Sequence, residues 1–302
     1  MATRSYKETI QNEYQASWGG RTLVLTDYTP PPASTFADGR GTVGHRFPTR
    51  GRRTETAQEL GFSFGLEPTY ADVADIFPDF FCGSSGTGEG AWAGYTKIEL
   101  PSDPSGTDGY NDFIVDYSHA QKIYADALLN KMTISFSGSD PIKLMLEAIG
   151  TTAPTNGTEN LGTADDSSMA RTADAACTIG TDTYYPESGE IAISHSILTR
   201  PIIGSIVPKI TGADVFECTG SLTFTLNADV WDHLLAYIDS STGFAFTWKA
   251  TAGDYGFGVA LADIIFQGPL PSISGEGQHT HSLPFIASGT SSDMVYGYYD
   301  LA

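Results

Sequence analysis

The two halves of this chain contain the same elements in the same order. Each half has an alternating apolar strand, a short helix that begins with aspartate, a long connection, and a Ser-x-Ser-Gly turn leading into another apolar segment. The first copy has these elements at 61–66, 72–77, 135–138 and 144–150. The second copy has them at 222–226, 229–235, 272–275 and 282–289. A period near half the chain predicts a duplicated domain, because solenoid repeats are only ~20–50 residues long.

Chain length agrees with this interpretation, since 302 residues are enough for two domains that each bury a core. We predict a first β domain over 1–150 and a second over 183–302, with 151–182 as a linker or surface loop. The segment 82–120 is rich in Gly, Ser, Asp and Thr. It has no counterpart of similar length in the second half and is predicted to be a long loop insertion.

The composition favours β structure, because 33 glycines and 16 prolines suit short strands joined by turns. Alternating apolar patterns predict strands at 21–26, 57–66, 121–136, 189–197, 220–226, 244–248 and 259–266, and a hairpin of 270–274 with 279–287. Helices are expected at 72–77, stopped by Pro78, and at 229–237. The predicted fold is mainly β: two tandem β-sandwiches or small barrels, each with a short flanking helix.

The net charge of −20 argues against a protein that grips nucleic acid, because such proteins neutralise phosphates with clustered Lys and Arg. The arginines between Arg46 and Arg53 fit a local loop contact better. The three cysteines lack metal-ligand spacing, and reduced structural thiols are expected. A polar N-terminus and the lack of an apolar run of ~20 residues predict neither a signal peptide nor a membrane span.

No catalytic motif is recognisable, so we predict no enzymatic activity, no cofactor and no metal. His279 and His281 share one face of a strand and form a candidate metal pair, although an exposed polar face explains them better. Asp72 with Asp75, and Asp229 with Asp232, could act as paired carboxylates. Their recurrence at matching positions favours a structural role.

The repeated unit resembles the tail tube proteins of long-tailed bacteriophages (siphoviruses). The resemblance is carried by the order of strand, Asp-led helix, strand and closing hairpin, at 222–237 with 272–287 and at 61–77 with 135–149. It covers about two thirds of the chain and is a pattern of elements, without a diagnostic motif. The 82–120 insertion departs from a simple single-domain tail tube protein.

This resemblance implies that six β domains form a ring and that stacked rings form a tube for DNA ejection. A duplicated chain then implies a homotrimeric, pseudo-hexameric ring in the phage virion, with the chain made in the host cytoplasm. Partners would be other copies of the chain and the tape measure, distal tail and tail terminator proteins. DNA would pass a negatively charged lumen without specific binding, and no membrane would be involved.

Candidates for the inner sheet and the contacts between subunits come from the alternating strands 57–66, 131–136, 218–226 and 270–274. These candidates are Phe62, Phe64, Thr133, Ser135, Thr223, Thr225, Ser272 and Ser274. Two alternatives stay open. One is a baseplate hub or distal tail protein, and the other is a carbohydrate-binding β-sandwich that uses Trp92, Tyr95, Trp231 or Trp248 as sugar platforms.

Overall fold

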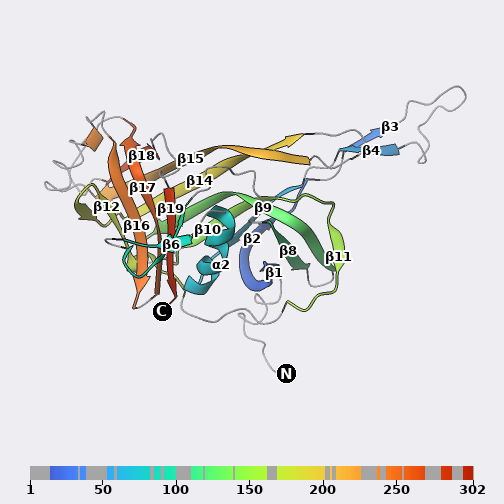
Figure 1. Ribbon diagram of the computed structural model, residues 1–302, viewed down its shortest axis with the longest axis horizontal. Coiled ribbons are helices and arrows are strands. Elements are labelled where there is room, and N and C mark those ends of the chain that lie inside the picture. The colour runs from blue at the N-terminus through green and yellow to red at the C-terminus, as the bar shows by residue number, and fades with distance from the viewer. Residues whose placement is uncertain are drawn as a thin grey trace, which may run out of the picture.

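The computed structural model is mainly β, as predicted, and the residues that it describes include one long helix (Figure 1). It describes residues 14–32, 35–38, 53–57, 60–81, 85–89, 92–99, 110–117, 120–138, 140–161, 169–200, 205, 209–225, 237–238, 243–253, 255–268, 280–287 and 295–301. Seventeen strands belong to one hydrogen-bonded network, and β3 (Thr35–Asp38) pairs separately with β4 (Arg53–Ala57).

The first half contains a closed barrel of six antiparallel strands. Its strands are β1 (Tyr14–Trp18), β2 (Arg21–Thr29), β5 (Gly61–Leu66), β10 (Lys143–Ile149), β9 (Ala120–Ser137) and β8 (Tyr110–Tyr117). Each strand pairs with the next in this order, and β8 pairs back with β1. The barrel closes because alternate side chains of every strand, including Phe62, Phe64 and Phe113, are buried inside.

Helix α2 (Tyr70–Phe81) is longer than the sequence predicted, because it continues through Pro78. A proline inside a helix removes one backbone hydrogen bond and costs ~3 kcal/mol. Here the turn beyond Pro78 buries Phe80 and Phe81 completely, and burying each aromatic side chain contributes ~1.5–3 kcal/mol. Tertiary packing therefore overrides the local stop signal.

The start of α2 is held by a reciprocal cap. The Thr69 backbone amide donates to Asp72 Oδ2 (2.9 Å), and the Asp72 amide donates to Thr69 Oγ1 (3.1 Å). Arg21 of β2 donates to both Asp72 (2.9 Å) and Asp75 (2.7 Å), which ties the helix to the barrel. Asp72 and Asp75 therefore serve the structural role that the sequence favoured.

Replacing Asp72 by alanine should lower the free energy of unfolding by about 1–2 kcal/mol, because the cap and an ion pair are lost together. Asp75→Ala is the matched control. Asp75 is half exposed and, within the described part of the chain, forms an ion pair with Arg21 alone, so its loss should cost less than about 1 kcal/mol. Urea unfolding of the unassembled chain measures both, and equal losses would contradict the capping role.

The second half repeats the pairing order of the first. Its strands are β12 (Ala175–Ile179), β13 (Asp182–Tyr184), β14 (Ser188–Arg200), β15 (Lys209–Thr225), β16 (Phe244–Ala252), β17 (Tyr255–Phe266) and β18 (Thr280–Ala287). β14 pairs with β15, β15 with β18, β18 with β17, β17 with β16, and β16 with β12. β13 directly precedes β14 in the sequence. It pairs with β12 in the same way that the start of β2 pairs with β1.

The registers of the first hairpins also match. Ser17 pairs with Thr22 in the first half, and Thr178 pairs with Thr183 in the second, so both members are shifted by 161 positions (178 minus 17, 183 minus 22). β2 corresponds to β13 together with β14, and β5, β8, β9 and β10 correspond to β15, β16, β17 and β18. Tyr237 and Ile238 are helical at the place after β15 that α2 occupies after β5.

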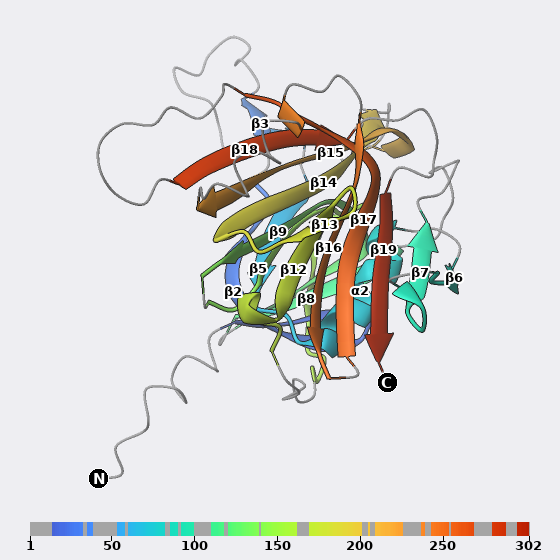
Figure 2. The ribbon, with the colours of Figure 1, turned by 90° about the vertical axis from the view of Figure 1, so that its left-hand side faces the viewer.

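The two halves share strands and core. β9 pairs with β14 from Lys131↔Ser194 to Ser137↔Ser188 and so joins the halves into one sheet (Figure 2). β19 (Val295–Leu301) pairs with both β17 and β7 (Thr96–Glu99), and α2 packs against β9, β17 and β19. One continuous cluster of buried side chains therefore runs through both halves. The predicted division at 150 and 183 stays a prediction.

Two segments contain more regular structure than the sequence predicted. The 82–120 insertion, expected to be a loop, contributes β6 (Ser85–Thr87), β7 and β8, because Ile98, Phe113 and Val115 reach the core. The segment 151–182 contains β11 (Thr155–Gly157), a 3-10 turn (Thr172–Asp174) and β12, and it buries Ile179. The strand predicted at 270–274 and most of the helix predicted at 229–237 lie outside the described residues.

Candidate self-assembly surface

One face of the sheet shared by both halves is lined with small hydroxyl side chains. This sheet runs in the order β5, β10, β9, β14, β15 and β18. Its inward side chains are mostly apolar and buried, and His195 of β14 and the half-buried His281 of β18 are polar exceptions. The hydroxyl residues on the outward face are Ser63, Thr133, Ser135, Ser137, Ser188, Ser194, Thr219, Ser221, Thr223, Thr225, Thr280 and Ser282. Alternation with a period of two produces this separation of the faces.

Four of the predicted inner-sheet residues share this outward face. Thr133 and Ser135 of β9 and Thr223 and Thr225 of β15 are half-buried and belong to its cross-strand rows, one of which runs Ser137, Ser188, Thr223 and Ser282. Phe62 and Phe64 lie in β5 of the same sheet, but their side chains are 4% and 0% exposed and point into the barrel. Ser272 and Ser274 lie outside the described residues. A role of any of them in contacts between subunits stays a prediction.

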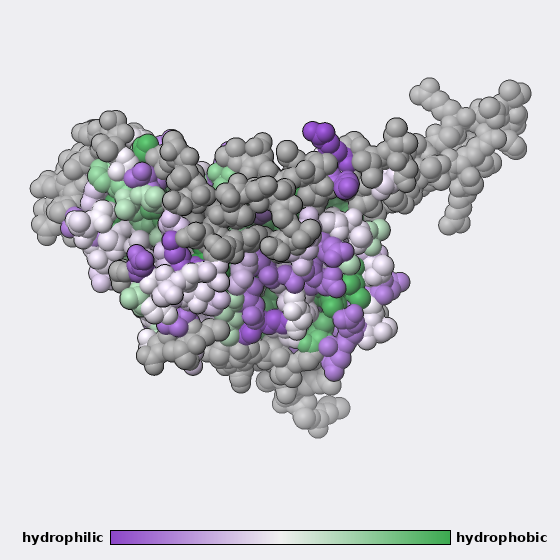
Figure 3. Space-filling view, in the orientation of Figure 1, coloured by the Kyte–Doolittle hydropathy of each residue, from purple (hydrophilic) through white to green (hydrophobic). Residues whose placement is uncertain are grey.

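The outward face has few charges among its described residues. Lys131 Nζ and Glu147 Oε1 form an ion pair at 2.8 Å. Lys143 lies at the end of β10, and Glu190 and Glu217 are exposed on β14 and β15. The face therefore combines hydroxyl groups with a small excess of acid. Figure 3 shows another view of the surface, in which hydrophilic areas alternate with small hydrophobic ones.

A buried histidine lies where β9 meets β14. His195 is 4% exposed, and its Nε2 is 2.5 Å from the backbone oxygen of Leu129 on β9. Its ring stacks on Phe216 at 5.0 Å between centroids and meets the ring of Phe80 edge-on at 5.7 Å. Burial lowers the pKa of His195 below its usual value, because the protonated ring would lose its hydration. Sequence reasoning missed this residue, whose only signal was a histidine in an alternating strand.

We expect the contact between β9 and β14 at His195 to make the folded chain less stable in acid. The unfolded chain takes up a proton on His195 near pH 6.5, whereas the folded chain resists it, so stability is lost as the pH falls below that value. We expect the melting temperature of the unassembled chain to drop between pH 7 and pH 5. His195→Leu should lower stability at pH 7 but flatten this dependence, and an equally steep slope in the variant would contradict the assignment.

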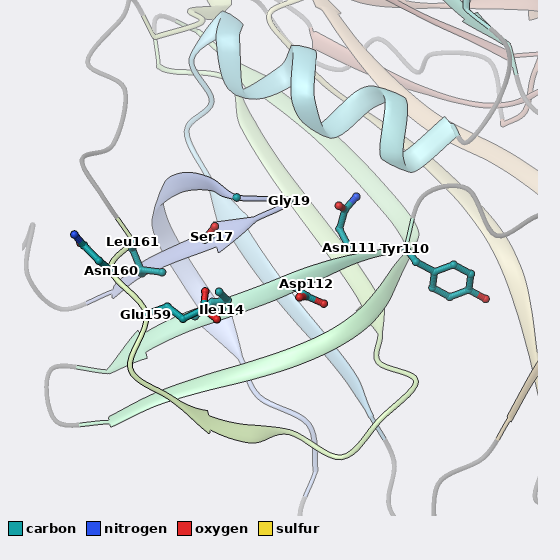
Figure 4. A pocket seen from close by; sticks show the side chains of 10 residues that line it. Ser17, Gly19, Tyr110, Asn111, Asp112, Ile114, Glu159, Asn160 and Leu161 are labelled. Carbon is teal, nitrogen blue, oxygen red and sulfur yellow. The ribbon is translucent and has the colours of Figure 1, made fainter.

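A polar pocket of about 410 Å³ opens beside the turn between β1 and β2 (Figure 4). Asp112 and Glu159 line it, with Asn111, Asn160 and Tyr110. Asp112 Oδ1 already accepts a hydrogen bond from the Asp126 amide (3.0 Å), and the Glu159 backbone is bound on both sides by Gln121. These hydrogen bonds give Asp112 and Glu159 a structural role in holding neighbouring backbone segments. Among the described residues, no group of three acidic, His or Cys side chains could hold a metal.

The sugar-platform alternative finds little support in the aromatic residues. Trp92 is 4% exposed and stacks on Tyr298 at 4.2 Å, and Trp248 is fully buried. Tyr95 meets Trp92 edge-on, and Trp231 lies outside the described residues. His281 pairs across the sheet with Phe224, and His279, the other member of the candidate metal pair, lies outside the described residues.

These features define a mainly β protein whose candidate functional surface is the hydroxyl-rich outward face of its shared sheet. No helix among the described residues is long and apolar enough to cross a membrane. The chain belongs to the phage tail tube protein family: the family model described as "Phage tail tube protein" matches residues 7–287. No curated protein matches the chain. Membership makes it a structural component of the virion tail that assembles into the tube.

Proposed function

We propose that the two halves are duplicated tail tube domains and that three chains supply six of them to each ring. The repeated pairing order of the halves carries this proposal, together with the matching registers of their first hairpins. A domain that appears twice per chain needs only three chains to surround a channel with six similar units. Stacked rings then form the tube that conducts DNA from the capsid to the host cell.

In this arrangement the hydroxyl-rich face of the shared sheet lines the channel. Serine and threonine side chains are short and uncharged, so they offer the phosphates of DNA no cation to bind. On this face Glu147, Glu190 and Glu217 outnumber Lys131 and Lys143, in keeping with the net charge of −20 of the whole chain. The DNA would therefore slide past a weakly repulsive wall without specific binding.

The remaining partners would be other components of the tail. The ends of the tube would contact the distal tail and tail terminator proteins, and the channel would hold the tape measure protein before DNA passes. No step of this function requires a cofactor or covalent chemistry. The chain would be made in the host cytoplasm and work in the virion.

Negative-stain electron microscopy of the purified protein tests the assembly. We expect rings or tubes with a central channel, and averaged end-on views with threefold symmetry and six lobes. A protein that stays monomeric at high concentration and binds glycans would overturn the proposal. A ring of six whole chains would overturn the stoichiometry alone.

Reversing charge on the proposed channel wall should impair DNA passage and leave assembly intact. In phage carrying Glu190→Lys with Glu217→Lys, we expect normal tubes but at least tenfold fewer productive infections, because lysine would bind the passing phosphates. The doubly Gln-substituted protein is the control for size, and it should remain near wild type. Normal infectivity of the lysine variant would contradict the placement of this face.

A further inference from the structure

Two buried polar atoms belong to residues that line one small cavity, at the place where β9 of the first half packs against β16 of the second. The cavity measures about 10 Å³, counted over the positions that the centre of a water molecule can occupy, and its walls include Phe136, Thr172, Pro186 and Trp248. Trp248 is 0% exposed and Thr172 is 8% exposed. Neither Trp248 Nε1 nor Thr172 Oγ1 has a hydrogen-bond partner among the described residues.

These two groups need a partner, because a buried donor or acceptor that makes no hydrogen bond loses its hydration without compensation. Nearly all buried polar groups in folded proteins bond to another protein group or to an ordered water. An indole N–H can only donate, whereas a threonine hydroxyl can donate or accept. The cavity therefore suits a small molecule that accepts a hydrogen bond from Trp248 and bonds with Thr172 in either direction.

A single water molecule meets these requirements. A buried water needs about 10–15 Å³ on the same measure, together with two to four polar partners. A cation would be repelled by the indole N–H, and an anion would be buried without a counter-charge, since none of the described residues that line the cavity is charged. We propose that one water molecule occupies this cavity, accepts a hydrogen bond from Trp248 Nε1 and bonds with the Thr172 hydroxyl.

This water links the two halves of the chain. The Thr172 backbone amide donates to the backbone oxygen of Asp140 (3.1 Å), which lies between β9 and β10 of the first half. Trp248 belongs to β16 of the second half, and its ring stacks on Phe136 of β9 at 5.4 Å between centroids. The water therefore connects the segment 151–182, which the sequence predicted to be a linker or surface loop, to the core of the second half.

The repeated pairing order supplies a comparison position in the first half. Ala16 pairs with Val115, and Cys177, which is 161 positions after Ala16, pairs with Trp248. Val115 therefore corresponds to Trp248 and is equally buried. A valine side chain has no polar atom to satisfy, so the donor that needs a water at this position is present in the second half alone.

An experimental structure of the full chain, at a resolution that shows ordered waters, tests the proposal directly. We expect density for a water within hydrogen-bond distance, about 2.7–3.2 Å, of both Trp248 Nε1 and Thr172 Oγ1. Thr172→Ser keeps the hydroxyl and should keep this water. A direct hydrogen bond between the two side chains, or a cavity without density for a water, would overturn the proposal.

Melting temperatures followed by circular dichroism give a second measurement. Thr172→Val keeps the shape of the side chain but removes the hydroxyl, and we expect the melting temperature to fall by about 2–4 °C. Thr247→Val is the matched control, because Thr247 precedes Trp248 in β16 but does not line the cavity, and it should leave the melting temperature unchanged.

A double substitution tests whether the two groups share one water. Trp248→Phe removes the donor, so the water has already lost one of its two side-chain partners. Adding Thr172→Val to Trp248→Phe should therefore lower the melting temperature by less than Thr172→Val does in the wild-type chain. Equal losses in the two backgrounds would contradict the shared water.

Discussion

Phe113→Ala should be among the most destabilising single substitutions in the first barrel, with an expected loss of about 3–5 kcal/mol in the free energy of unfolding. Phe113 is fully buried, and its ring lies 4.6 Å from that of Phe64 and 4.8 Å from that of Phe62 between centroids. The rings of Trp18, Tyr28 and Tyr124 also lie beside it. Alanine would leave a cavity among aromatic rings that cannot collapse without moving several strands.

The matched control is Phe113→Leu, which keeps most of the volume and should cost about 1–1.5 kcal/mol. Urea denaturation of the unassembled chain, followed by tryptophan fluorescence, measures both variants, because Trp18 lies beside the substituted ring. If the alanine variant remained within 1 kcal/mol of wild type, the packing described for this barrel would be wrong.

Gly220→Val should destabilise the joined sheet by about 3 kcal/mol, although valine is otherwise favoured in strands. A Cβ atom at Gly220 would overlap the backbone oxygen of Glu190 on β14 and the ring of Phe285 on β18. The ring can rotate away, but the backbone oxygen belongs to a central strand and cannot move without breaking the ladder. Glycine is therefore required at this position by close approach of the neighbours.

Gly61→Val serves as its control, because no atom lies within 4 Å of a Cβ placed there. We expect the control to be neutral or slightly stabilising, and a difference in melting temperature between the two variants of at least several degrees. Equal melting temperatures would show that β14 and β18 lie further from Gly220 than the structure places them.

Much of the strand content could be predicted from alternation alone. The strands at 21–26, 121–136, 189–197, 220–226, 244–248 and 259–266 are confirmed. The period of two is clear where only one face lies in the core, as in β16 with Phe246, Trp248 and Ala250 buried. The outward position of Thr133, Ser135, Thr223 and Thr225 follows from the same alternation. Phe62 and Phe64 alternate equally well but belong to the buried face, and alternation alone does not say which face is outside.

The elements that were missed depend on contacts distant in sequence. β7 and β8 lie in a segment whose Gly and Asp content predicts a loop, and they form because β19 and β1 supply partners from the far ends of the chain. α2 passes Pro78 because two phenylalanines beyond it reach the core. The position of His195 depends on Leu129, 66 residues away. The sequence pattern around a residue does not indicate which distant residues it will contact.

The placement of β19 between β17 and β7 has a consequence for folding during synthesis. The ribosome synthesises β7 and α2 long before residues 295–301, which form β19. Until β19 emerges, the edges of both β7 and β17 that it later occupies remain open, and contacts of such long sequence separation form slowly. The nascent chain therefore completes its two halves together, at the end of translation. A copy that has not finished synthesis therefore exposes strand edges that β19 covers in the finished chain.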